Sequence, residues 1–296
     1  LEKKMERKDC IGSTCAPAVV GTSKHKGPHD VFLQSMGVVK PATEYMEVSL
    51  IDEASHTTLL SIKLARMGRP AEFKKCPTYF HVEDGVNLRA SPDRKAVISR
   101  RHTRPVYLVE LKNCYWADRG EYGEEFSSDV PPGYRDQCIW HMGLAKLKNH
   151  EVDATILSCR FKIGHFPELF VVPRDDERFA WMMAECVDFW HRYVETKTPP
   201  PADSSGECRK AQALAREWED KTREVTTAER AKLREVFKKT AGIAKLEDEI
   251  DLLKNQLLEG ADGHERLTLN EKRIVSFTAN KNGARSLRTN FKGVEL

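Results

Sequence analysis

The stretch PVYLVELKNCYW, residues 105–116, decides how the rest of the chain is interpreted. Its apolar and β-branched residues predict a strand, yet Glu110 and Lys112 interrupt them. Side chains two residues apart on a strand point to the same face, so both charges are expected to leave the sheet together. Placing two charges on a buried sheet face costs free energy unless they are paired with other groups or serve a function. The pair therefore marks a candidate site.

The composition is that of a globular protein. The 296 residues are 40% apolar and 31% charged, which suits one large domain or two smaller ones. No run of about 18 apolar residues occurs, so neither a transmembrane helix nor a membrane partner is expected. The opening LEKKMERKDC lacks the apolar centre of a secretory signal. We therefore expect a cytoplasmic protein.

Cysteine spacing argues against a zinc ribbon or finger. The eight cysteines, at positions 10, 15, 76, 114, 138, 159, 186 and 208, form no CxxC pair. Reduced thiols in a reducing compartment explain them. An iron–sulfur cluster built from distant cysteines is the alternative.

Basic residues gather at both ends of the chain. Residues 1–26 hold six Lys or Arg against three Asp or Glu, and residues 271–296 hold six against two. This distribution is compatible with a polyanionic partner such as nucleic acid. A solvated surface explains such modest numbers equally well.

The order of helical and β patterns predicts an α/β fold with a mixed central sheet flanked by helices. The first helix should cover residues 12–21, with Ser13 or Thr14 as N-cap and Gly21 as its end. Further helices are expected over 27–37, most of 54–76, 134–150 and 176–197. Strands are expected within 78–93, 96–113, 153–161 and 168–175, with a polar, mobile loop at 117–133.

The C-terminal third reads as a separate arm. TKTPPPADSSGE, residues 196–207, has the composition of a linker, so the domains are expected to be 1–200 and 201–296. In the charged helical segment that follows, apolar residues repeat at steps of three and four: Ile243, Leu246, Ile250, Leu253 and Leu257. The repeat is short for a coiled coil, so a helical hairpin is expected. A terminal β-hairpin should turn at Asn282-Gly283.

Three acidic motifs predict a metal site beside the Glu110 strand. Asp93 ends the motif SPD, and Glu72 lies in GRPAE, on or beside a helix. Mg²⁺ prefers hard oxygen ligands and takes few carboxylates. Asp93 and Glu110 on neighbouring strands could hold it with the Leu111 carbonyl, and Glu72 could bind directly or through water. Lys112 could position the attacking water and offset phosphate charge, so the group suits metal-assisted phosphodiester hydrolysis.

The motifs resemble a known group of nucleases. The Asp93, Glu110 and Lys112 pattern is similar to that of the PD-(D/E)xK nucleases. YRDQCIWHM, residues 134–142, resembles the Y-x-x-Q-x-x-x-x-M helix of viral-type recombination exonucleases, the lambda exonuclease or YqaJ-like family. RKDCIGSTCAPAVVG resembles the opening element of that family, and GRPAE its G-x-x-x-E. The likeness spans roughly residues 5–200.

The resemblance implies a role for each matched residue. Asp93 and Glu110 would be metal ligands, Lys112 the catalytic lysine, Gln137 the residue that orients the lysine or the water, and Glu72 an accessory acid. A pocket for a 5′-phosphate would form from Arg7, Thr14 and Ser91. Arg94 replaces the glycine that follows PD in the family, the gap between Asp93 and Glu110 is long, and the last hundred residues lie outside the lambda pattern.

The activity that the resemblance implies is digestion of linear double-stranded DNA from a 5′ end. Mg²⁺ would be required, with Mn²⁺ able to substitute, and no organic cofactor is expected. A ring-shaped homotrimer would thread the duplex and leave single strand for an annealing protein. Such recombination takes place in a bacterial or phage-infected cell.

Two other functions remain open on the sequence alone. The same chemistry serves structure-specific endonucleases, and a decayed nuclease core could act as a non-catalytic DNA-binding scaffold. A decayed site should lack Asp93, Glu110 or Lys112, and all three are present. Each residue also has an ordinary explanation: an exposed edge pair for Glu110 and Lys112, or a turn for Asp93. His141 lies near Gln137 without an evident ligand partner, which favours a core or surface role.

Overall fold

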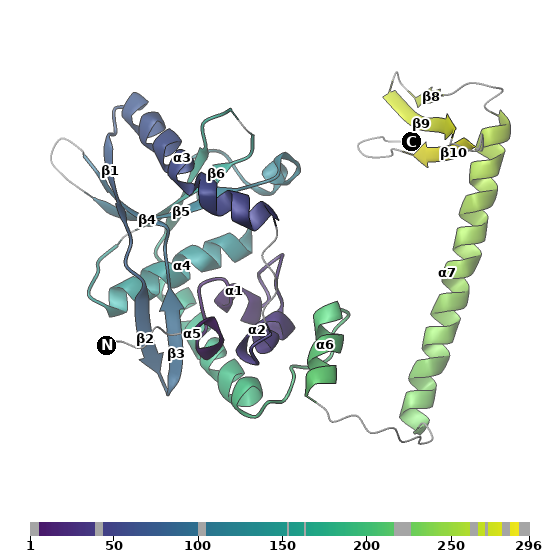
Figure 1. The fold of residues 1–296 in the computed structure, drawn as a ribbon, viewed down its shortest axis with the longest axis horizontal. Coiled ribbons are helices and arrows are strands. Elements are labelled where there is room, and N and C mark those ends of the chain that lie inside the picture. The colour runs from purple at the N-terminus through teal and green to yellow at the C-terminus, as the bar shows by residue number, and fades with distance from the viewer. Residues whose placement is uncertain are drawn as a thin grey trace. The chain divides into compact units, whose positions relative to one another are not determined.

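The structure, a computed structural model, describes residues 6–38, 44–99, 105–152, 154–162, 164–215, 226–260, 266–269, 272–279 and 285–289. It divides into two units, Leu1–Trp218 and Glu219–Leu296 (Figure 1). The first unit carries all of the predicted site residues. The expected boundary at residue 200 falls short of this division, because the segment after it packs onto the first unit.

The first unit is built on a five-stranded sheet in the order β1-β4-β5-β6-β7. Its strands are β1 (Ala71–Lys75), β4 (Arg94–Ile98), β5 (Val106–Asn113), β6 (Ala154–Arg160) and β7 (Glu168–Pro173). All neighbours are antiparallel except β5 and β6, which are parallel. The mixed sheet predicted from the sequence is therefore confirmed. Strands β2 (Tyr79–Glu83) and β3 (Val86–Ala90) pair separately as a two-stranded sheet.

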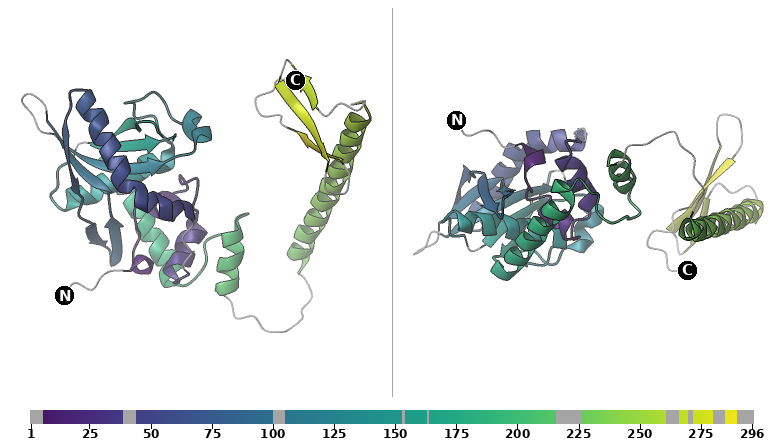
Figure 2. Two further views of the ribbon diagram at one scale, coloured as in Figure 1. Left: turned by 45° about the horizontal axis from the view of Figure 1, so that its top comes forward. Right: turned by 90° about the horizontal axis from the view of Figure 1, so that it is seen from below.

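Helices cover both faces of the five-stranded sheet, as the views of Figures 1 and 2 show. Helix α3 (Glu44–Arg66) lies on one face and α4 (Pro132–Leu147) on the other. Helices α1 (Ala16–Val19) and α5 (Asp176–Phe189) pack against α4, α2 (Pro28–Ser35) packs against α1, and α6 (Gly206–Leu214) packs against α2. Short 3-10 helices span Arg7–Asp9 and Trp116–Glu121, and a π-helical turn, Trp190–Glu195, follows α5. None of the described helices combines the length and apolar character needed to cross a membrane.

Strand β5 separates two hydrophobic clusters. Leu108 packs in the cluster that includes Trp140 of α4, whereas Val109 packs in the cluster that includes Leu60 of α3. Because side chains alternate across a strand, Glu110 and Lys112 lie on the same face as Leu108. The spacing argument is thus confirmed, and both charges point to the α4 side of the sheet.

Helix α4 is the crossover between the parallel strands β5 and β6, and it is almost entirely enclosed. All ten residues from Asp136 to Ala145 are buried. The Asp136 carboxylate accepts hydrogen bonds from both Nε and Nη2 of Arg178, at 3.0 and 2.7 Å, and from Thr22 Oγ1 at 2.7 Å. This buried anchor ties α4 to α5 and to the segment after α1, so the helix has little freedom to move over the sheet.

The region before the sheet departs from the sequence prediction. Residues 54–76 were expected to be mostly helical, but α3 ends at Arg66 and β1 begins at Ala71. Gly68 has φ +69°, which ends the helix and which a residue with a Cβ adopts only at a cost. The five residues of β1 then pair with β4 along their whole length. Residues 71–75 form a strand because they pair with β4, and this long-range pairing cannot be predicted from the propensities of the segment itself.

Two segments expected to be loose are held by hydrogen bonds. In the polar 117–133 loop, Phe126 N–H donates to the Leu169 carbonyl at 2.7 Å, and the Ser127 carbonyl accepts from Val171 N–H at 3.0 Å. In the proline-rich 196–207 segment, the buried His29 ring contacts the Pro200 carbonyl through Nε2 at 3.2 Å and Asp203 through Nδ1 at 3.0 Å. Ala211 of α6 then joins the main core. The 196–207 segment is therefore packed against the first unit and is not a free linker.

The second unit contains one long helix and a small sheet. Helix α7 (Thr227–Gly260) is continuous over 34 residues, so the expected helical hairpin is wrong. Strands β8 (Arg266–Leu269), β9 (Lys272–Ala279) and β10 (Arg285–Thr289) form an antiparallel sheet in the order β10-β9-β8. The terminal hairpin is confirmed in β9 and β10, with β8 as an added strand. Asn282-Gly283 lies outside the described residues.

Candidate active site

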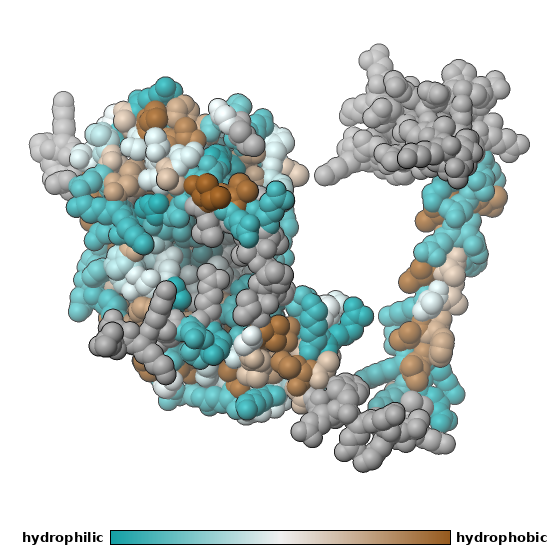
Figure 3. All heavy atoms as spheres, viewed as in Figure 1, coloured by the Kyte–Doolittle hydropathy of each residue, from teal (hydrophilic) through white to brown (hydrophobic). Residues whose placement is uncertain are grey.

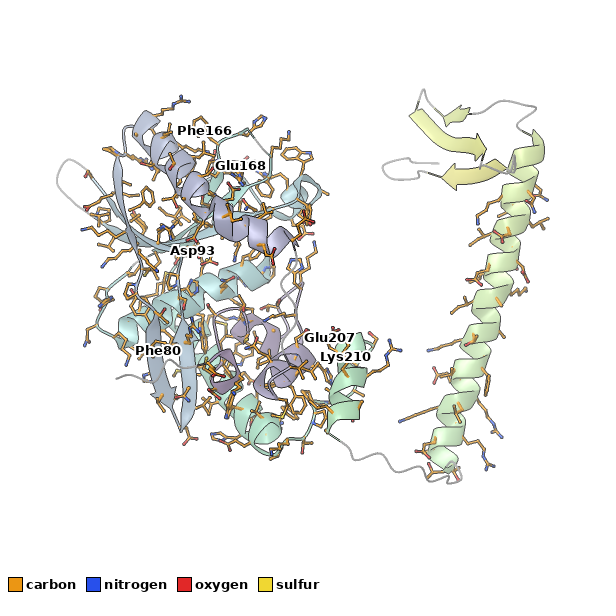
Figure 4. All side chains as sticks on the ribbon, in the orientation of Figure 1. Phe80, Asp93, Phe166, Glu168, Glu207 and Lys210 are labelled. Atoms are coloured by element: carbon orange, nitrogen blue, oxygen red, sulfur yellow. The ribbon has the colours of Figure 1, made fainter. Side chains whose placement is uncertain are left out.

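The site forms at the start of β4, beyond which β5 continues without β4 as a neighbour. Arg94 of β4 is opposite Val109 of β5, and this is the last residue pair between the two strands. Asp93 immediately precedes Arg94 in the chain, and its Oδ2 accepts a 2.7 Å hydrogen bond from the backbone N–H of Leu111. The Asp93 carboxylate thus accepts the hydrogen bond that a backbone carbonyl of a longer β4 would accept. Figure 4 labels Asp93, which lies between α3 and α4 in that view.

Glu110 is the centre of the site and is only 4% exposed. Its Oε1 accepts hydrogen bonds from Lys112 Nζ at 2.7 Å and from Gln137 Nε2 at 2.6 Å. Its Oε2 is buried and has no hydrogen-bond partner among the described residues. A buried carboxylate oxygen without a partner is costly, and such atoms often mark the place of a ligand or an ion.

His141 faces the same oxygen from α4. It follows Gln137 by four residues, so both side chains lie on one face of the helix. Its Nδ1 is 3.5 Å from Glu110 Oε2, too far for a good hydrogen bond, and neither ring nitrogen has a partner among the described residues. Burial lowers the pKa of His141 to about 4, although Glu110 acts in the opposite direction. The imidazole is therefore neutral near pH 7.

The two carboxyl groups and the lysine perturb one another. Burial, and next the charge of Glu110, raise the pKa of Asp93 to about 7. Burial by itself would lower the pKa of Lys112, but Glu110 and then Asp93 more than offset this and raise it above its usual value. Lys112 Nζ also lies 5.3 Å from the centre of the Tyr134 ring. Lys112 is therefore a protonated ammonium group, fixed in position by its ion pair with Glu110.

These residues fit a divalent cation. Glu110 Oε2 has no partner among the described residues and the pKa of Asp93 stays raised, so Lys112 alone does not neutralise the two crowded carboxyl groups. The Leu111 carbonyl is directed to the same strand edge as its N–H, which is bonded to Asp93, because the two groups of one strand residue point the same way. Asp93, Glu110 and this carbonyl form a hard-oxygen donor set of the type that Mg²⁺ prefers.

Glu72 does not join the cluster. It lies on edge strand β1 opposite Val97, its side chain is 53% exposed, and it forms a 3.0 Å ion pair with Lys74. The structure brings a different acid close. Glu53 of α3 forms an ion pair with Arg94, the residue after Asp93, and its charge contributes to the raised pKa of Asp93. No motif in the sequence singled out Glu53, because α3 meets the strand end only in the folded chain.

The three residues of the expected phosphate pocket lie along β3 and the chain start. Ile11 pairs with Leu88 of β3, and the Ile11 carbonyl accepts from Arg89 N–H at 2.9 Å. Ser91 follows β3, and its hydroxyl accepts a 3.2 Å hydrogen bond from Arg89 Nε. Thr14 is exposed in the turn before the four-residue α1, whose N-cap is Cys15 instead of Ser13 or Thr14. The Arg7 side chain lies outside the described residues. The pocket stays a prediction.

The cysteines give no sign of a cluster in the part of the chain that is described. None of the eight is in a disulfide, and five of them, Cys15, Cys76, Cys138, Cys159 and Cys186, lie in the main hydrophobic cluster. Among the described residues, the one group of three possible metal-binding side chains outside the acid site is His29, Asp203 and Cys208. It contains a single cysteine, so the iron–sulfur alternative gains no support.

The sequence matches no family model, and no curated protein matches it. Solved structures resemble it at low identity. An alkaline exonuclease from Laribacter hongkongensis is 14% identical over 70% of this chain and 95% of that one, with a TM-score of 0.46. Its complex with dAMP gives the same identity and TM-score. A candidate exonuclease from Eubacterium rectale is 10% identical over 74% of this chain and 91% of that one, also with a TM-score of 0.46. The case for an activity therefore rests on the site itself.

Proposed function

We propose that this protein is a divalent-metal-dependent deoxyribonuclease that digests linear double-stranded DNA from its ends, in the 5′-to-3′ direction. One observation carries the proposal. Two strands and a helix bring the carboxylates of Asp93 and Glu110, the ammonium of Lys112 and the amide of Gln137 together, with one carboxylate oxygen left unpartnered. Phosphodiester hydrolysis can use such groups: carboxylates that bind a metal ion, an ammonium group that stabilises phosphate charge, and an amide that orients a carboxylate.

Asp93, Glu110 and the Leu111 carbonyl would hold Mg²⁺, and Mn²⁺ would substitute. A bound ion polarises a phosphate oxygen and lowers the pKa of bound water. Lys112 remains protonated because of its acidic neighbours, so it stabilises negative charge on the phosphate and can give a proton to an oxygen there. This favours charge stabilisation over the alternative that Lys112 deprotonates the water.

Gln137 and His141 serve to fix Glu110. The Gln137 amide donates to Oε1 and so orients the carboxylate with Oε2 directed away from Lys112. The neutral, enclosed His141 imidazole lies on the Oε2 side and can act as a donor or a ligand atom without adding charge. Because α4 is anchored through Asp136, both side chains are held in place before any substrate arrives.

A 5′-phosphate would be bound by Arg7, Thr14 and Ser91, and we add Arg89 to this set. Its guanidinium contacts the Ser91 hydroxyl, and guanidinium groups bind phosphate through two donors at once. The single-strand-annealing partner, the ring-shaped trimer and a role in phage-type recombination are proposals that follow from the resemblance of the motifs alone.

The test uses linear duplex labelled at its 5′ or its 3′ ends, with Mg²⁺, Mn²⁺ or EDTA. The proposal expects Mg²⁺-dependent release of the 5′ label first, a preference for 5′-phosphate over 5′-hydroxyl ends, and no attack on closed circular plasmid. Nicking of the plasmid would instead indicate a structure-specific endonuclease. Tight DNA binding without any cleavage would indicate a scaffold.

Two matched variants separate the site from general damage. Glu110→Gln keeps the shape and the hydrogen-bond acceptor but removes the negative charge, so cleavage should be lost. Glu72→Gln makes the same chemical change on the exposed edge strand and should cleave like the unchanged protein. Equal activity of the two variants would contradict the assignment.

A further inference from the structure

Helix α7 leaves a row of apolar side chains exposed. Ile243, Leu246, Ile250 and Leu253 are each between 50% and 59% exposed, as is Val236 one heptad before Ile243. Brown, apolar spheres recur along this helix in Figure 3. We call these five residues the α7 seam. A highly charged helix gains most of its stability in a protein from packing an apolar face, so the seam needs a partner.

The seam has the spacing of a coiled coil. From Ile243 to Leu253 its residues follow at steps of three, four and three. That average of 3.5 residues keeps one side of a helix against a partner helix over several turns. Leu257 continues the repeat in the sequence, while Lys239 interrupts it toward the start of the helix. The seam is therefore about three heptads long.

The residue types at the seam favour one kind of assembly. With Ile243 as heptad position a, three of the four a positions are β-branched, namely Val236, Ile243 and Ile250, and the fourth is Leu257. The two d positions beyond Ile243 are Leu246 and Leu253. β-Branched residues at a with leucine at d favour a parallel, two-stranded coiled coil. We propose that α7 pairs in parallel with α7 of a second copy of this chain.

The flanking charges agree with this orientation. In a parallel pair, position g of one helix lies beside the next e position of the other, which sets Glu249 against Lys254 of the partner subunit, twice by symmetry. Both side chains are about half exposed, and among the described residues their ion pairs are with neighbours on their own helix, Lys245 at 3.8 Å and Asp251 at 2.7 Å. An antiparallel pair would place g beside g and e beside e, and this pairing would be lost.

The pairing would make the second unit a dimerisation element, separate from catalysis. It involves none of the residues of the acid site and requires no assembly of the Leu1–Trp218 unit. It would bring two catalytic units to one DNA molecule, whatever arrangement those units adopt among themselves. Because the seam is short, association is expected to depend on protein concentration.

The first test compares two neighbouring leucines in the full chain. Leu253→Gln replaces a seam residue, and Leu252→Gln makes the same change at the adjacent residue, which is 58% exposed but lies off the seam. By sedimentation equilibrium over a range of concentrations, Leu253→Gln should have half the mass of the unchanged protein, while Leu252→Gln should match it. Equal masses for all three proteins would overturn the proposal.

The second test examines orientation. Glu249→Lys alone sets two lysines against each other in a parallel pair, and Lys254→Glu alone sets two glutamates against each other. Each variant should associate at least several-fold more weakly than the unchanged protein, and an equimolar mixture should regain the lost affinity through mixed pairs. A mixture no stronger than its components would exclude the parallel arrangement. Nuclease activity per chain at a labelled end, measured beside these masses, shows whether the catalytic proposal holds independently.

Discussion

Asp93 is bonded to the backbone of the strand that carries its partner acid, because its carboxylate accepts the Leu111 N–H at 2.7 Å. The two acids are thus fixed by main-chain geometry and not by flexible side chains alone. This explains how the protein keeps two carboxylates close together although burial and Glu110 both oppose the ionisation of Asp93. The expected outcomes below follow from that arrangement.

Asp93→Asn should stabilise the metal-free protein while it removes cleavage. The folded-state pKa of Asp93, about 7, lies above its usual value of 3.8, so the carboxyl group favours folding when protonated and opposes it when ionised. Asparagine keeps the acceptor for Leu111 without the charge. In EDTA at pH 8, the free energy of unfolding should rise by about 1–4 kcal/mol, and the gain should shrink as pH falls from 7 toward 4. Urea titrations at several pH values measure this, and a loss of stability at pH 8 would contradict it.

Binding of Mg²⁺ should release a proton from Asp93 below pH 7. Because the ion requires the ionised carboxylate, its affinity should rise by up to about tenfold per pH unit below 7 and level off above that pH. Calorimetric titration without DNA, in two buffers of different ionisation enthalpy, gives both the affinity and the number of protons released. Asp93→Asn is the control, since it should remove the proton release. An affinity independent of pH between 5.5 and 8.5 would disprove the coupling.

Lys112→Met should abolish cleavage and also destabilise the protein, since it leaves the Glu110 charge buried without its ion-pair partner. The loss in unfolding free energy should be about 1–3 kcal/mol. The double variant Lys112→Met/Glu110→Gln should recover most of that stability and remain inactive. Thermal unfolding together with end-label release distinguishes the two effects. Retained cleavage in Lys112→Met would remove the lysine from the mechanism.

Glu53→Gln should reduce cleavage by at least about tenfold, a loss of about 1.4 kcal/mol in transition-state stabilisation. Glu53 holds Arg94 next to Asp93, so its removal frees a cation beside the ligand set. Glu72→Gln, in contrast, should lie within twofold of the unchanged protein. Initial rates at saturating Mg²⁺ test both, and a larger effect at Glu72 would restore the role that the sequence motif implied.

Gly143→Ala should destabilise the first unit although alanine favours helices. A Cβ at this position of α4 would lie 2.1 Å from Cδ2 of Phe179, so the buried Phe179 ring of α5 or the helix that carries it would have to shift. The cost of overpacking, about 1–3 kcal/mol or more, exceeds the gain in helix propensity of up to about 1 kcal/mol. Gly242→Ala on α7, with nothing within 4 Å, is the matched control and should not lower stability. Denaturant unfolding followed by CD compares the two.

The sheet and the central acids were predictable because their signals are local. Alternation along β5 placed Glu110 and Lys112 on one face, and the two face-specific clusters of Leu108 and Val109 confirm it. Turn residues also located the helix ends, as at Gly21, whose φ is +76°. Such features depend on a few neighbouring residues, so a single sequence contains them.

Other features depended on contacts between distant residues. Strand β1 was taken for helix because its pairing with β4 is not encoded in AEFKK itself, and Glu53 was missed because α3 reaches Arg94 only through the fold. His141 could have been found, since it follows Gln137 by one helical turn on α4. The single α7 helix was mistaken for a hairpin because the heptad repeat is short for a long coiled coil, and the repeat alone does not show whether the chain turns back.

The pairing of Arg94 with Val109 also determines where this chain can tolerate changes in length. Added residues between Ile98 and Val106 lengthen only the connection between the two strands, which accounts for the long interval between Asp93 and Glu110 in the sequence. A single residue inserted within β4 would instead shift the ladder by one step and turn Asp93 toward the opposite side of the sheet. Length variation among natural versions of this protein should therefore be found in that connection and not within either strand.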